Sequence, residues 1–273
     1  MALSRGAATS ALRSIDLRAP ESWEFSGFSQ SGEDGIIDVL TRQIRSPNRY
    51  FIEIGSSDGL ENNTTWLALA GRWSGIWVEG DARTSEWSSW LFSSLNYGLE
   101  TICSFVDEQN VGDLAQRALY LDPDVFSLDI DGIDYYLAKV VLESGFRPKI
   151  FVVEYNSAFG PTQRMTIPYS PTFRRGHGFG DDLYYGCSVA GWKQLFERFG
   201  YTFVTVDLNG VNAFFIRTEE FEVGFVEAIR GTHFRENFAQ LRQHRKRWEA
   251  QLAMIEARDL EQIPSSLDHS QAN

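Results

Sequence analysis

Oxygen-bearing side chains follow two apolar runs of the chain, at points where buried strands would end. Asp129 and Asp131 end one run, and Glu154 and Asn156 end the next. Side chains at i and i+2 of a strand share a face, so each pair converges if its strand persists. Acids without a neighbouring Lys or Arg repel one another unless a cation neutralises them, and such oxygens suit Mg²⁺, Ca²⁺ or Mn²⁺. The spacing predicts a divalent metal site; alternatively, Asp129 or Asp131 only contacts a ligand or caps the following helix.

A glycine turn follows an earlier apolar run and ends in Gly55-Ser56-Ser57-Asp58-Gly59. Glycines let the backbone approach a ligand closely. Glu79 lies 20 positions past Gly59, where a ribose-binding carboxylate is expected. The G-x-G-x-x-G pattern of dinucleotide sites is absent, and acids around the turn repel phosphate. The turn therefore indicates S-adenosylmethionine (SAM), unless it is a plain strand-to-helix turn. The predicted cofactor residues are Glu53, Gly55, Ser56, Asp58, Gly59, Glu79 and Asp129.

Residues 157–187 form a Pro- and Gly-rich segment that we interpret as a lid over the site. His177 lies within it and could act as a general base, although a loop histidine is more often merely exposed. Asp131 and His177 are the candidate catalytic residues. Aromatic side chains near the lid are candidate walls of an acceptor pocket, with lid packing as the alternative: Tyr155, Phe173, Tyr184 and Tyr185.

Alternating strands and helices must position these groups. Strands are expected at 50–55, 75–79, 99–106, 125–130 and 150–154, with helices at 31–46, 62–69, 84–95, 111–119, 135–142 and 188–199. Ser31 is the expected cap of the first helix. Near-continuous apolar strands separated by helices predict a mostly parallel sheet covered on both faces. Residues 201–206 and 211–217 predict a closing antiparallel hairpin around Leu208-Asn209-Gly210.

Composition excludes several classes of protein. The 273 residues carry a formal charge of −12, which excludes a global basic footprint for nucleic acid. Hydrophobic residues make up 43%, too many for a disordered chain, yet no apolar run reaches the ~20 residues of a membrane span. Two cysteines cannot build a disulfide framework. We expect a cytoplasmic globular protein with a small-molecule partner, and neither nucleic acid nor membrane.

Three regions are expected along the chain. Residues 1–26 form an N-terminal arm, whose first part loosely resembles an organellar presequence, and 27–217 form the main domain. Residues 218–273 form a helical extension and a polar tail. Apolar positions recur there as in a heptad, with one charged member: Phe234, Phe238, Leu241, Arg245, Trp248, Leu252 and Ile255. This seam predicts either a helix packed on its own domain or a homo-oligomer contact.

Several motifs together resemble the FkbM-type SAM-dependent methyltransferases over about residues 27–135. They are the S-Q-S-G-E-D run 29–34, the acidic glycine turn, the N-T pair 63–64 and the G-I-W-V-E run 75–79. The resemblance implies a Rossmann-like class I methyltransferase fold, with Gln30, Gly55, Gly59 and Glu79 lining the SAM site and Asp107 facing adenine. The run D-I-D-G at 129–132 is richer in acids than the family's usual D-x-E-G.

The resemblance also implies an activity. We expect methyl transfer to an oxygen of a polar small molecule, such as a sugar or secondary-metabolite hydroxyl. The acids at 129, 131 and 154 and the amide at 156 look like those of metal-dependent O-methyltransferases, in which the ion lowers the pKa of the acceptor hydroxyl. A non-catalytic methyltransferase-like interaction protein and transfer of another SAM-derived group are the alternatives.

Overall fold

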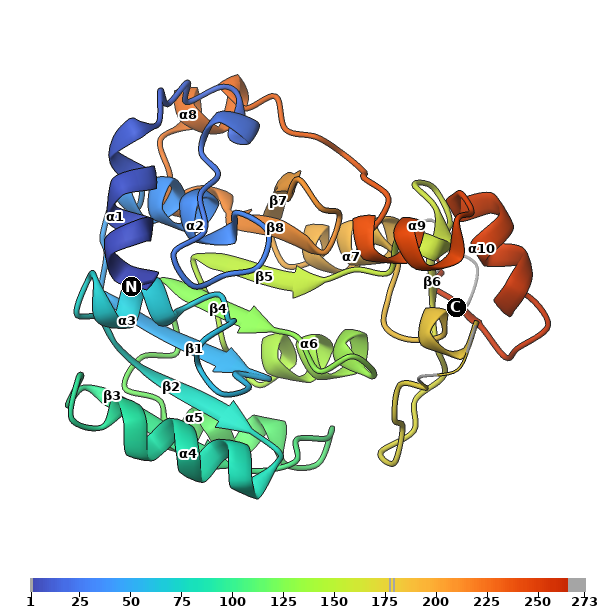
Figure 1. Cartoon of the computed structure of the whole chain (residues 1–273), viewed down its shortest axis with the longest axis horizontal. Helices are drawn as coiled ribbons and strands as arrows, with labels where there is room; N and C mark the ends of the chain where they lie inside the picture. The colour runs from blue at the N-terminus through green and yellow to red at the C-terminus, as the bar shows by residue number, and fades with distance from the viewer. Residues whose placement is uncertain (1, 177, 179, 265–273) are drawn as a thin grey trace, which may run out of the picture.

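One seven-stranded sheet forms the centre of the protein (Figure 1). The structure, a computed structural model, describes residues 2–176, 178 and 180–264. The strands are β1 (Tyr50–Ile54), β2 (Ser74–Glu79), β3 (Leu99–Cys103), β4 (Val125–Leu128), β5 (Ile150–Glu154), β7 (Tyr201–Val206) and β8 (Asn212–Arg217). Their order is β3-β2-β1-β4-β5-β8-β7, with β8 antiparallel to both neighbours and the other pairs parallel. The predicted Rossmann-like fold with a closing hairpin is confirmed.

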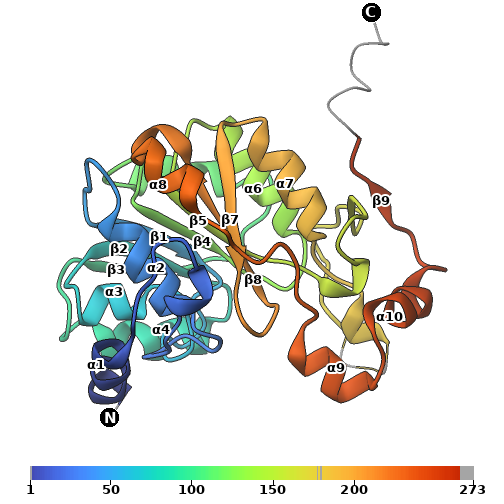
Figure 2. The ribbon, with the colours of Figure 1, turned by 90° about the horizontal axis from the view of Figure 1, so that it is seen from above.

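Helices cover both faces of this sheet (Figure 2). The short helix α3 (Thr65–Leu69) lies with α2 (Glu33–Arg42) and α4 (Ala82–Phe92) on one face, and α5 (Leu114–Arg117), α6 (Asp134–Glu143) and α7 (Val189–Glu197) lie on the other. Side chains alternate along β1, so that Phe51 packs under the first group while Ile52 and Ile54 pack under the second. Within the described residues, no helix is long and apolar enough to cross a membrane.

The ends of two predicted elements differ in ways that matter for the site. The strand expected at 125–130 ends at Leu128, and Asp131 has φ +55, so the two acids after it do not follow the strand alternation. The helix expected from Ser31 begins at Glu33, and its N-cap is Gly32, with φ +97 and no side-chain cap. The predicted cap at Ser31 is therefore wrong, because the chain enters this helix through a left-handed glycine.

The acids of the S-Q-S-G-E-D run hold the backbone instead. One carboxylate oxygen of Asp34 accepts hydrogen bonds from the backbone N–H groups of Gly27, Phe28 and Ser29 at 2.7, 2.7 and 3.0 Å. This buried carboxylate fixes the segment that precedes α2. Further upstream, α1 (Ala2–Leu12) and the residues after it also pack on the domain, and an ion pair of 2.7 Å joins Arg13 to Asp38 of α2.

The continuous heptad helix expected in the C-terminal segment (residues 234–263) is wrong. Two short helices form there, α9 (Phe238–His244) and α10 (Trp248–Ile255), because Arg245 takes a left-handed conformation with φ +53. Phe234, Leu252 and Ile255 pack against the core beside α6 and α7. Strand β9 (Glu261–Gln262) then pairs with β6 (Met165–Thr166) of the lid. Packing on the own domain is thus the arrangement observed for this segment.

Candidate active site

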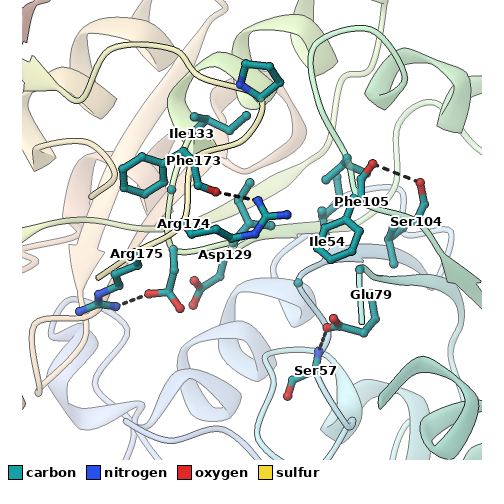
Figure 3. Close-up of a pocket in the computed structure, with 18 of the residues that line it drawn as sticks. Ile54, Ser57, Glu79, Ser104, Phe105, Asp129, Ile133, Phe173, Arg174 and Arg175 are labelled. Carbon is teal, nitrogen blue, oxygen red and sulfur yellow. Dashed lines mark hydrogen bonds and ion pairs between the residues drawn. The ribbon is translucent and has the colours of Figure 1, made fainter. Parts of the chain in front are cut away.

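The main cleft lies at the carboxyl ends of β1, β2 and β4 and has a volume of about 680 Å³ (Figure 3). The strand order turns back between β1 and β4, and ligands of open parallel sheets bind at such a switch point. The volume falls in the range of ligand pockets. Its walls are formed by strand ends and by the lid: Ile54, Gly55, Ser57, Val78, Glu79, Gly80, 104–106, 129–133, Ser170, Pro171 and 173–175.

The glycine turn brings the backbone of β1 against that of β4. Gly55 has φ +84, and a Cβ there would lie 1.6 Å from the carbonyl oxygen of Asp129. Only glycine allows this approach, which gives the cleft its floor. Gly59 also has φ +76, but it faces the rings of Trp77 and Phe92 behind the turn. Of the two predicted glycines, Gly55 therefore lines the cleft and Gly59 shapes the turn.

Glu79 reaches the cleft from β2, as predicted. Its carboxylate accepts hydrogen bonds from the backbone N–H groups of Ser57 at 2.9 Å and Asp81 at 2.7 Å, and each oxygen keeps a lone pair for a ligand (Figure 3). Phe105, with 64% of its surface exposed, forms the facing wall. The neighbouring Asp107 accepts hydrogen bonds from the backbone N–H groups of Gln109 and Asn110 and does not line this cleft, so its contact with adenine stays a prediction.

Three other predicted cofactor residues lie beside or behind the cleft. Glu53 is buried and accepts from the backbone N–H groups of Asn63 at 2.8 Å and Thr64 at 3.2 Å, and burial raises its pKa to about 7. Asp58 accepts from the N–H of Leu60 within its own turn. Ser56 is buried, and its hydroxyl has no hydrogen-bond partner among the described residues. These three residues therefore help to shape the glycine turn from the side that faces away from the cleft.

A small acidic cavity of about 50 Å³ opens behind Gly55. Glu33, Glu53 and Asp129 line it together with Asn212, and Gly55 and Asp129 also line the main cleft. Asn212 donates from its amide nitrogen to Glu33 at 2.9 Å, while its buried carbonyl oxygen lacks a partner in the described part of the chain. The cavity thus offers hydrogen-bond acceptors to a ligand that carries N–H or O–H groups. Gln30, predicted at the cofactor site, lies here and donates to Glu61 at 3.2 Å.

The structure brings together the three carboxylates of the predicted metal site. One oxygen each of Asp129, Asp131 and Glu154 lies within 4.8 Å of the others, and we call these residues the carboxylate cluster. Burial and mutual repulsion raise the pKa of Asp129 and of Glu154 well above their usual ranges, and a nearby arginine opposes this rise. The amide nitrogen of Asn156 donates to two lid carbonyl oxygens at 2.7 and 2.9 Å, and its Oδ1 accepts from the N–H of Ala158 at 3.0 Å, so its role as a metal ligand stays a prediction.

That arginine is Arg175, which supplies the acids with a neighbouring cation that was not predicted from the sequence. Its Nη1 donates to Asp131 and lies 3.8 Å from Glu154, while the guanidinium stacks on the ring of Tyr185 at 3.6 Å. The lid supplies this residue from far along the sequence, so strand spacing gave no signal for it. Arg174 beside it lies across the main cleft, between Asp129 and Phe105 (Figure 3).

The aromatic residues predicted as acceptor walls separate into two groups. Phe173 lines the main cleft. Tyr155 and Tyr185 are fully buried, and the Tyr155 hydroxyl donates to a backbone carbonyl oxygen at 2.6 Å, as does that of Tyr184. These three join the lid or β5 to the C-terminal segment, so they pack the lid as the alternative interpretation had it. His177 lies outside the described residues.

Comparisons with known proteins identify similar solved structures but no family. No family model matches the chain, and no curated protein matches it. Among solved structures, the chain is similar to the METTL16 methyltransferase domain at 13% identity and TM-score 0.35, covering 44% of this chain and 49% of that one. The chain thus spans about half the length of that domain.

Two further solved structures cover more of the chain. The O-methyltransferase from Bacillus cereus in complex with SAH (S-adenosylhomocysteine) is 13% identical, with TM-score 0.44 over 78% of this chain and 86% of that one. The O-methyltransferase TomG from Streptomyces achromogenes, in complex with SAM, is 16% identical, with TM-score 0.45 over 78% and 94%. At these identities and TM-scores the similarity assigns neither a family nor a ligand to this chain.

Proposed function

We propose that this protein is a SAM-dependent methyltransferase that methylates an oxygen of a polar small molecule. The observation that carries the proposal is that the main cleft adjoins the acidic cavity, since Gly55 and Asp129 line both. SAM carries a sulfonium and an ammonium group and has no phosphate. The groups around this junction suit such a donor, since the carboxylate cluster contains three acids and Arg175 is paired with one of them.

Each part of the donor has a matching part of the site. The apolar wall of Ile54, Val78 and Phe105 suits adenine, and the free lone pairs of Glu79 suit the ribose hydroxyls. The acidic cavity suits the ammonium group, because it offers the Asn212 carbonyl oxygen, which has no partner among the described residues, and because a cation favours the ionised, accepting form of the acids that line it. Donor entry requires Arg174 to leave the face of Phe105, 4.9 Å from its guanidinium carbon.

The reaction needs alignment, deprotonation and exclusion of water. The acceptor oxygen attacks the methyl carbon, the sulfur–carbon bond breaks with its electron pair remaining on sulfur, and S-adenosylhomocysteine leaves. The hydroxyl proton passes to a carboxylate, for which we propose Asp131, because its side chain lines the cleft and is 54% exposed. The FkbM-type resemblance over residues 27–135 supports the same activity.

A divalent cation is the finer part of this proposal. Asp129, Asp131 and Glu154 would hold the ion in place of Arg175, and their clustered oxygens support it. Such an ion supplies a positive charge that lowers the pKa of an acceptor hydroxyl. Turnover measured with EDTA, and then with Mg²⁺ added back, tests this part. Unchanged turnover under both conditions would remove the ion from the proposal.

Calorimetric titration tests the donor site. Wild-type protein should bind S-adenosylhomocysteine, and Glu79→Ala should weaken binding about 10- to 100-fold, since a hydrogen bond to a charged group contributes ~1.5–3 kcal/mol. Glu79→Gln keeps an acceptor oxygen and should retain part of the affinity, while Glu86→Ala on the exposed face of α4 is the matched control. Equal affinity of Glu79→Ala and wild type would refute the ribose contact. Binding of NAD⁺ in place of S-adenosylhomocysteine would refute the function.

A further inference from the structure

A second cavity lies on the far side of Arg175 from the main cleft. It has a volume of about 340 Å³, and Arg175 lines both spaces. Glu154 of the carboxylate cluster lines the second cavity as well. A molecule held there would lie next to the junction at which the donor's methyl group is expected. This position suits the acceptor. Tyr155 and Tyr185, which were predicted to line an acceptor pocket, are buried and are not positioned to contact it.

The lining of this cavity is rich in amide side chains, and we call it the amide pocket. It combines three distant parts of the chain: Gln30 and Ser31 before α2, Asn209 in the β7–β8 turn, and Asn237, Gln240 and Gln243 from α9. An amide both donates and accepts hydrogen bonds, as a hydroxyl group does. A ligand with many hydroxyl groups could satisfy such a lining in several directions.

Some of these amides are already committed to the fold, and others are free. Asn237 caps α9, and Gln240 donates to the Tyr185 hydroxyl at 3.1 Å while it accepts from a serine. Asn209 donates to Ser31 at 3.1 Å, which leaves its carbonyl oxygen. The exposed side chain of Gln243 makes no hydrogen bond with any described residue. The amides at the base of the pocket are therefore held by hydrogen bonds within the fold, whereas polar groups at its opening are free to bind a ligand.

Charge and aromatic surface restrict the kind of ligand further. Glu154 and Asp182 oppose an anionic ligand. Among the described residues, Arg175 is the one cation that lines the pocket, and it is already paired with Asp131. Phe238 is 55% exposed and offers a ring face at the same wall. A ring face beside groups that bind hydroxyls suits a saturated ring with an apolar C–H face and a hydroxylated edge. A flat aromatic acceptor would leave the amides unpaired, which costs binding energy.

We propose that the amide pocket binds the acceptor, that the acceptor is a neutral pyranose ring, and that Phe238 and Gln243 of α9 select it. This inference rests on the proposed methyl transfer, because it assigns the acceptor side of the same site. It also gives the C-terminal segment a direct role in substrate recognition. The ring packs on Phe238, and Gln243 and Asn209 bind its hydroxyls. The reacting hydroxyl points past Glu154 toward the carboxylate cluster, in which Asp131 takes the proton.

Saturation-transfer NMR on the full chain with S-adenosylhomocysteine bound tests this assignment. The probes are methyl pyranosides of gluco, galacto, manno and fuco configuration, with catechol as the flat aromatic competitor. At least one pyranoside should bind, and Phe238→Ala and Gln243→Ala should each weaken it about 3- to 10-fold. Trp90→Ala and Gln109→Ala, at exposed positions outside the amide pocket, should leave binding unchanged.

The outcomes separate this inference from the donor proposal. S-adenosylhomocysteine affinity, measured by calorimetry, should be the same in the wild type and in both α9 variants. Absence of donor binding in the wild type would refute the methyltransferase function, whatever the pyranosides do. Normal donor binding without any pyranoside signal, binding of catechol alone, or pyranoside binding unaffected by both α9 variants would each overturn the acceptor assignment.

Discussion

Replacing Glu53 with glutamine is expected to flatten the pH dependence of folding stability. The buried carboxyl has a pKa of about 7 in the folded protein against a usual 4.5. The folded state therefore keeps this proton to a higher pH than the unfolded state, and the free energy of unfolding falls as pH rises from 4.5 through 7. Each pKa unit corresponds to ~1.4 kcal/mol, so ionisation of Glu53 removes about 3 kcal/mol of stability across that window.

Urea unfolding followed by tryptophan fluorescence at pH 5 and pH 8 measures this effect. Wild type should lose about 2–3 kcal/mol more between the two pH values than Glu53→Gln does. Altered hydrogen bonding of the amide to Asn63 and Thr64 is the same at both pH values and cancels in the comparison. Glu86→Gln, at an exposed position on α4, should keep the wild-type slope. Equal slopes for Glu53→Gln and wild type would refute the role of burial.

Other substitutions probe the turn, the core and the lid. Gly55→Ala should cost at least about 2 kcal/mol and abolish S-adenosylhomocysteine binding, because φ is +84 and a carbonyl oxygen fills the Cβ position; calorimetry showing normal affinity would contradict this. Lys149→Met should lower the free energy of unfolding by ~3–5 kcal/mol, because it leaves the buried carboxylate of Asp124, 2.7 Å away, without its cation. Lys139→Met, at a partly exposed position of α6, should cost under ~1 kcal/mol; equal losses of stability in urea would count against this prediction. Tyr136→Phe removes a 2.6 Å hydrogen bond to Glu261, so it should speed hydrogen exchange in β6 and lower the free energy of unfolding by ~1 kcal/mol. Unchanged exchange would show that this bond does not stabilise the pairing of β6 with β9.

The sheet and the floor of the site follow from local sequence patterns. Parallel strands place their carboxyl ends on one edge, so Gly55, Glu79, Asp129 and Glu154 could be placed near one another without knowledge of the loops. The turn glycine was expected from the close approach of a ligand, whereas the structure shows that the backbone of Asp129 after β4 fills the space of a side chain there. These predictions depend on spacing within elements, which the sequence encodes directly.

The walls and the charge balance could not be predicted in this way. Arg175 lies in a long lid whose path depends on tertiary packing. No residue close to Asp131 in sequence indicates that this arginine contacts the carboxylate cluster. Arg245 breaks a heptad pattern by taking a left-handed conformation, which periodicity cannot detect. Tyr155 and Tyr185 look like pocket aromatics but bury their rings, because their hydroxyls find partners in the C-terminal segment. The amide pocket was missed because distant segments build it.

The pairing of β6 with β9, reinforced by the Tyr136–Glu261 bond, has a consequence for the order of folding. The bonded residues lie 125 positions apart, so their contact closes a long loop and carries a large entropic cost. The strands of the sheet are closer together in sequence and can pair first, whereas the lid over the site takes its final shape only when residues 234–263 dock. Refolding should therefore restore the tryptophan fluorescence of the core before it restores ligand binding. The delay between these two signals measures how slowly residues 234–263 dock.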